Sequence, residues 1–102
     1  MNQLGLFKDW LQEHLDDLKE QAPERKHEIN DLYQRVTTAY ETELNGMLVA
    51  NDVVLALTAQ LTTVQEEIQR RIDQNDDIAG IIDKVTTGVG IATKIAGFFI
   101  KP

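Results

Sequence analysis

Hydrophobic residues recur every seven positions through the middle of the chain. A first series runs from Tyr33 to Ile68 at intervals of seven, and a second series follows three residues after the first. This a/d spacing is typical of a helix that packs along one seam. The predicted helix-packing or oligomer seam consists of Tyr33, Tyr40, Met47, Val54, Leu57, Leu61, Val64 and Ile68.

Shorter helices are predicted on either side of this run. Residues 2–21 place apolar side chains at alternating spacings of three and four, with acidic side chains opposite. Pro23 ends this helix, because proline disfavours helix in the preceding residue and suits the first turn of a new one. A polar turn at Asn75–Asp77 precedes the last helix. We therefore predict helices over about 2–21, 24–75 and 77–100, all within one domain covering residues 1–102.

The continuity of the middle helix depends on Asn45 and Gly46, a pair that commonly ends helices. We favour one helix over about 24–75, because the heptad phase continues unchanged through the pair and the residues that follow are apolar. The favoured fold is an all-α helical bundle in which the terminal helices fold back on a central helix ~75 Å long. The alternative is a four-helix up-and-down bundle with a break at Asn45–Gly46.

The centre of the heptad run has few charges. Between Leu44 and Gln65 the one charged side chain is that of Asp52, and apolar residues extend well beyond the seam. A helix that is apolar on several sides is usually buried on several sides. We therefore expect a homo-oligomer, with a two-fold dimer favoured, in which a second copy covers what the terminal helices leave exposed.

Residues 78–100 differ from the rest in composition, since they contain four glycines and no leucine. Each glycine costs about 1 kcal/mol of helix propensity relative to alanine, so this helix must gain from close contacts. Small residues four apart allow such contacts, and lysines beside an apolar face would also suit a membrane surface. The predicted close-packing or membrane-contact residues are Gly88, Ala92, Lys94, Ala96, Phe98 and Phe99.

Composition and charge exclude several classes of function. The net charge of −7 argues against nucleic-acid binding, which requires a basic surface. The chain contains neither cysteine nor serine, which removes the two commonest nucleophiles. Its two histidines lack the repeated carboxylate pattern of a metal site in a helical bundle. We expect no catalytic, cofactor or metal site, and therefore a protein that is not an enzyme.

These observations favour a non-enzymatic structural or adaptor protein that acts through oligomerisation and through contacts with an unidentified protein partner. One alternative is a membrane-active accessory protein that uses the apolar helix 78–100. A weaker alternative is a small acidic inhibitor or antitoxin whose charge mimics nucleic acid. Residues 1–25 lack the pattern of a signal peptide, so we expect a cytoplasmic protein, with association at a membrane surface under the first alternative.

Overall fold

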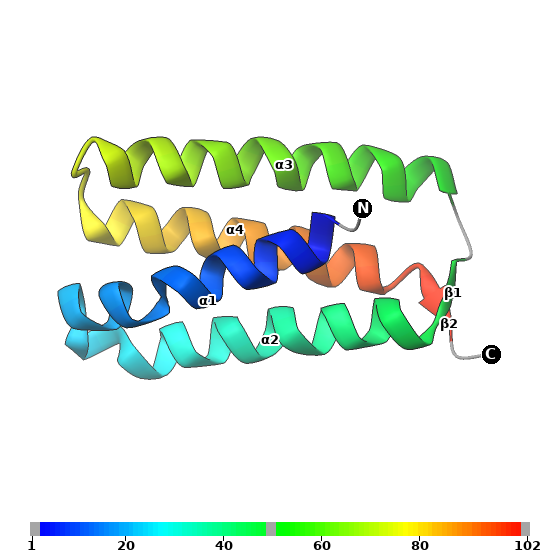
Figure 1. The fold of residues 1–102 in the computed structure, drawn as a ribbon, viewed down its shortest axis with the longest axis horizontal. Coiled ribbons are helices and arrows are strands. Elements are labelled where there is room, and N and C mark those ends of the chain that lie inside the picture. The colour runs from blue at the N-terminus through cyan, green and yellow to red at the C-terminus, as the bar shows by residue number, and fades with distance from the viewer. Residues whose placement is uncertain (1–2, 49–50, 101–102) are drawn as a thin grey trace.

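The computed structural model describes residues 3–48 and 51–100. Within these ranges, helices that run alternately in opposite directions make up nearly all of the structure, and two short strands pair antiparallel at one end (Figure 1). The predicted all-α helical bundle is confirmed. The elements are α1 (Gln3–Gln21), the 3-10 turn η1 (Pro23–Arg25), α2 (Lys26–Asn45), β1 (Met47–Leu48), α3 (Asn51–Asp73), α4 (Ile78–Ala96) and β2 (Phe99–Ile100).

The favoured continuous helix over 24–75 is wrong, and the alternative four-helix bundle with a break at Asn45–Gly46 is correct. Helix α2 ends at Asn45, and Gly46 is extended, with φ −106° and ψ 169°. The Asn45 Nδ2 group donates to the carbonyl oxygen of Glu41 at 2.9 Å, so this side chain folds back onto the last turn of the helix. The next residues form β1, in which Met47 lies opposite Ile100 of β2. The chain therefore leaves the helix to make a strand pair.

The heptad phase does not require a continuous helix, because α2 and α3 each bury a stripe of their own against α4. The two stripes can share a phase even though the chain between them is not helical. The apolar residues after the glycine are also compatible with a break, since the side chains of Met47 and Leu48 are exposed. The last helix likewise ends earlier than predicted, at Ala96, because the chain turns into β2.

The helices occupy the corners of a diamond. Helix α4 packs against both α2 and α3, and α1 packs mainly against α2. Helix α4 therefore covers both halves of the predicted central helix. Helices α2 and α3 lie at opposite corners, with α1 and α4 between them (Figure 1). The bundle measures 41 Å along its longest axis and is far shorter than a single 50-residue helix would be.

Helix α4 contributes most to the core. Its buried residues are Ile81, Ile82, Val85, Gly88, Val89, Ile91, Ala92, Ile95 and Ala96. The fully buried ring of Phe7 on α1 lies against Gly88, where an added Cβ would be 2.7 Å from the ring atom Cζ. Among the residues that the structure describes, no polar or charged residue is buried. The core is therefore apolar, and glycine at position 88 allows α1 and α4 to approach closely.

Two polar contacts fix α1 against α3. The indole Nε1 of Trp10 donates to Gln69 Oε1 at 2.7 Å. Nearer the start of the helix, the side-chain amide of Gln3 donates to Gln65 Oε1 at 2.9 Å. Hydrogen bonds of this kind each contribute about 1 kcal/mol, so they mainly fix the rotation of α1 about its axis, while apolar burial provides most of the stability.

We predict opposite effects for two glycine-to-alanine substitutions on α4. Gly88→Ala should lower the free energy of unfolding by about 1–3 kcal/mol, because the new methyl group overlaps the Phe7 ring, which is enclosed on all sides. Gly90→Ala should raise it by up to about 1 kcal/mol, because the added Cβ meets open space and alanine favours helix. Urea denaturation followed by circular dichroism measures both. Changes of the same sign would contradict the proposed contact between α1 and α4.

Candidate functional site

The predicted seam is divided between two helices and one strand. Tyr33 and Tyr40 belong to α2, and both rings are half-buried against the core. On α3, four seam residues are buried and Val64 is half-buried. Met47 lies in β1 instead of a helix, and 58% of its surface is exposed. The four buried seam residues on α3 are Val54, Leu57, Leu61 and Ile68.

The predicted close-packing residues near the end of the chain face the interior of the bundle. Gly88, Ala92 and Ala96 are all buried on α4. Phe98 and Phe99 are half-buried against the core, with Phe99 in β2, whereas Lys94 is exposed. Within the described ranges, no helix combines the length and apolar character needed to cross a membrane.

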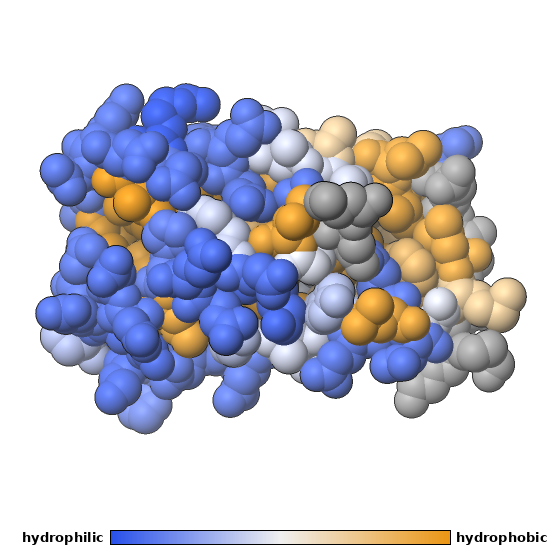
Figure 2. Space-filling view, viewed as in Figure 1, coloured by the Kyte–Doolittle hydropathy of each residue, from blue (hydrophilic) through white to orange (hydrophobic). Residues whose placement is uncertain are grey.

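Exposed apolar side chains gather at one end of the bundle, around the break between α2 and α3. Figure 2 shows hydrophobic surface over this end, whereas the opposite half of the same face is mostly hydrophilic. Among the described residues, α1 begins short of this end, and the last turn of α2 and the first turns of α3 extend past its start (Figure 1). We call these side chains the apolar end: Leu44 (59% exposed), Met47 (58%), Leu48 (45%), Val53 (46%) and Leu55 (60%).

Sequence reasoning did not include most of the apolar end among its site residues. It selected Met47 as a seam residue, but Leu44, Leu48, Val53 and Leu55 lie outside the a and d positions. The signal that could have identified them is their position in the nearly uncharged stretch from Leu44 to Gln65, where apolar residues exceed what one seam can bury.

Glu43 is a partly buried charged residue directly before Leu44 of the apolar end. It occupies a d position of α2 and is half-buried. Burial removes water from the carboxylate and raises the pKa of Glu43 above its ordinary value of 4.5. The folded protein therefore holds this charge at a cost in stability.

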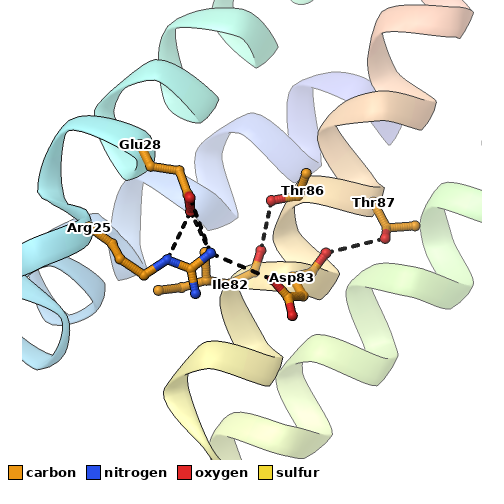
Figure 3. A network of polar contacts seen from close by, with 6 residues as sticks. All are labelled: Arg25, Glu28, Ile82, Asp83, Thr86 and Thr87. Carbon is orange, nitrogen blue, oxygen red and sulfur yellow. Dashed lines mark hydrogen bonds and ion pairs between the residues drawn. The ribbon is translucent and has the colours of Figure 1, made fainter.

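Charges at the other end of the bundle are paired between helices (Figure 3). Arg25 Nε donates to Glu28 Oε2 at 2.9 Å, and Arg25 Nη2 lies 3.5 Å from Asp83 Oδ1, which joins the start of α2 to α4. Arg25 Nη2 also donates to Glu28, and the remaining bonds in this view stay within α4: Thr86 donates to the carbonyl oxygen of Ile82 and Thr87 to that of Asp83. Such exposed pairs contribute little energy and mainly help to orient the helices.

A second set of charges joins α3 to α4. Lys84 Nζ lies 3.1 Å from Glu67 Oε1, and this hydrogen bond lowers the pKa of Glu67. Arg71 contacts both Glu67 and Asp76 at 3.5 Å. Across the described ranges, no three His, Asp or Glu side chains form a group that could hold a metal ion.

Two hollows lie between helices. A groove of about 380 Å³ between α2 and α4 is lined in part by Thr42, Thr93 and Ala96. The hydroxyl groups of Thr42 and Thr93 each donate to a backbone carbonyl of their own helix. A second hollow of about 320 Å³ at the charged end includes His14, whose Nδ1 lies 2.9 Å from the Trp10 carbonyl oxygen. Neither hollow contains a group of described side chains that could hold a metal ion, and the apolar end is the more prominent surface feature.

We predict that Glu43→Gln stabilises the protein at neutral pH, because the amide avoids burying a charge. A raised folded-state pKa means that the native state binds more protons than the unfolded state just above pH 4.5, so stability falls as the pH rises through this window. The advantage of the variant should therefore disappear below pH 4.5. The exposed Glu41→Gln is the control, expected to change stability by less than about 0.5 kcal/mol. Thermal unfolding between pH 3.5 and 8 tests this, and a pH-independent difference would contradict it.

Comparisons with known proteins do not assign a function to the apolar end. No family model matches this sequence. No curated protein matches it, and no solved structure matches the fold. The candidate functional site is therefore assigned on physical grounds alone, and the apolar end is the feature with the clearest need for a partner.

Proposed function

We propose that this chain is a non-enzymatic structural or adaptor protein that acts through protein–protein contacts at its apolar end. The observation that carries the proposal is the concentration of five exposed aliphatic side chains between Leu44 and Leu55. Together they expose on the order of 500 Å² of surface, which is near the upper range for the largest apolar patch on a monomer. Surfaces of this kind commonly bind another macromolecule.

The distribution of charge supports a contact at this end. Between Val36 and Gln65 the chain carries three acidic side chains and no basic one: Glu41, Glu43 and Asp52. A partner that covers this region therefore removes few charges from water, as is common at the centres of interfaces. The opposite end, where most of the charges lie in interhelical pairs or on exposed faces, is better suited to solvent.

The two alternatives have less support. Action on a membrane through residues 78–100 has its basis in Lys94 with Phe98 and Phe99, but most apolar side chains of α4 are buried and would have to leave the core first. An acidic inhibitor has its basis in the net charge of −7. Several of these carboxylates, including Glu67 and Asp83, already pair with cations of the same chain.

Site-specific photo-crosslinking tests the proposal. A photoreactive phenylalanine analogue at Leu55 should form adducts with protein in the cells that produce this chain, because that side chain is 60% exposed at the apolar end. The same analogue at the exposed Gln12 of α1 is the matched control and should form few. Mass spectrometry of the adducts identifies what was captured.

Equal labelling from the two positions, or no protein adduct from Leu55, would overturn the proposal. Circular dichroism of both labelled chains confirms that the bundle has formed, so that a negative result cannot arise from unfolding. The readout does not depend on knowing the partner in advance.

A further inference from the structure

We infer that the partner of the apolar end is a second copy of this chain, in a two-fold dimer that joins the bundles end to end around β1. This inference rests on the proposed function and adds the identity of the partner. In a two-fold dimer the same patch of each chain forms the interface, so an apolar patch can pack against its own copy. Here β1 is central, because exposed apolar residues precede it at Leu44 and follow it at Val53 and Leu55.

The size of the apolar end fits such a dimer. Covering on the order of 500 Å² on each copy would bury about 1,000 Å² in total, which is the lower limit for a specific interface. Phe98 and Phe99 lie half-buried at the same end and would add to this area. No conformational change is needed, since each of these residues already lies at the surface.

The charge distribution favours end-to-end contact over contact along the sides. The chain has a net charge of −7, so two copies repel each other wherever their acidic faces meet. At the apolar end the charges are few: Glu41, Glu43 and Asp52 are only partly offset by Lys94, while Lys8, whose ammonium group lies 5.6 Å from the centre of the Tyr40 ring, pairs with Asp9. The charged ends of two bundles, each 41 Å long, would then be separated by much more than the ~8–10 Å over which salt screens charge.

The strand pair provides a geometry for the contact. Strands β1 and β2 form a two-stranded sheet, so the outer edge of each lacks a partner strand within the described residues. Free strand edges readily accept a strand of another chain, and antiparallel addition of β1 to β1 has the required two-fold symmetry. The side chains of Met47 and Leu48, both exposed, would then lie at the centre of the interface.

A lipid surface explains the apolar end less well. Peripheral membrane binding usually combines apolar side chains with several basic ones that attract anionic headgroups. Between Val36 and Gln65 the sequence has no basic residue, and at the end of α4 the described residues add Lys94 alone. With Glu41, Glu43 and Asp52 against Lys94, this end has a small net negative charge, which does not attract an anionic bilayer.

Light scattering coupled to size-exclusion chromatography tests the inference on the full chain. The wild type should have twice the chain mass of 11.5 kDa at micromolar concentrations and dissociate on dilution. The double substitution Leu44→Glu and Leu55→Glu places two charges in the interface and should raise the dissociation constant tenfold or more. Two exposed glutamines outside the apolar end, Gln12 and Gln60, supply the control: Gln12→Glu with Gln60→Glu adds the same charge and should leave the dimer unchanged.

Cysteine crosslinking tests the geometry, and the chain suits it because it contains no cysteine. Met47→Cys should form a covalent dimer under mild oxidation, since a two-fold axis near β1 brings the two copies of this position together. Asp16→Cys, exposed on α1 away from this end, should remain monomeric on the same treatment. Circular dichroism and thermal unfolding show whether each variant keeps the fold.

Several results would overturn the inference. These are a wild-type chain that stays monomeric at high micromolar concentration, a dimer insensitive to Leu44→Glu with Leu55→Glu, or equal disulfide formation from positions 47 and 16. Monomers that float with phosphatidylcholine–phosphatidylglycerol vesicles in a Leu55-dependent manner would overturn it in favour of a membrane. If Leu55 crosslinks only to other proteins, the second copy is wrong while the proposed function stands; if it crosslinks to no protein, the function fails as well.

Discussion

The bundle depends on how closely α1 and α4 approach each other across the short diagonal of the diamond. The Phe7 ring lies directly on the backbone of Gly88 and has no exposed surface. Because a closely packed interior leaves the ring little room to move, the size of residue 88 sets the separation of these two helices. Helices α2 and α3 both pack on α4, so this one separation influences every other pair of neighbours.

The long axis of the bundle carries a gradient from charged to apolar. At one end, ion pairs such as Arg25–Asp83 and Glu67–Lys84 connect neighbouring helices and keep the surface hydrated. At the other end, the last turn of α2 and the first turns of α3 extend past the described start of α1, and apolar side chains remain in water. Glu43 is half-buried near them without an ion pair among the described contacts.

Local sequence signals predicted the helical class and the turn at Pro23, because proline acts on the residues next to it. The prediction of a continuous helix is wrong although Asn45–Gly46 is a local stop signal, because the heptad phase continues past it and the strand pair with Phe99 and Ile100 joins distant parts of the chain, which a local pattern does not contain. The candidate site was only partly predictable for a related reason. A heptad pattern identifies residues that face a seam, whereas the exposure of Leu44 and Leu55 depends on how the helices are placed along the bundle axis, which the pattern does not contain.

The position of α4 also has a kinetic consequence. Helices α1 and α2 form one local hairpin and α3 and α4 another, and each requires only a short loop to close. Because α2 and α3 are adjacent in sequence but diagonal in space, the halves share a core when α4 docks against α2 and α1 docks against α3. The slow, entropically costly event in folding should then be the meeting of the two hairpins, which brings together contacts as distant in sequence as Phe7 with Gly88 and Met47 with Ile100.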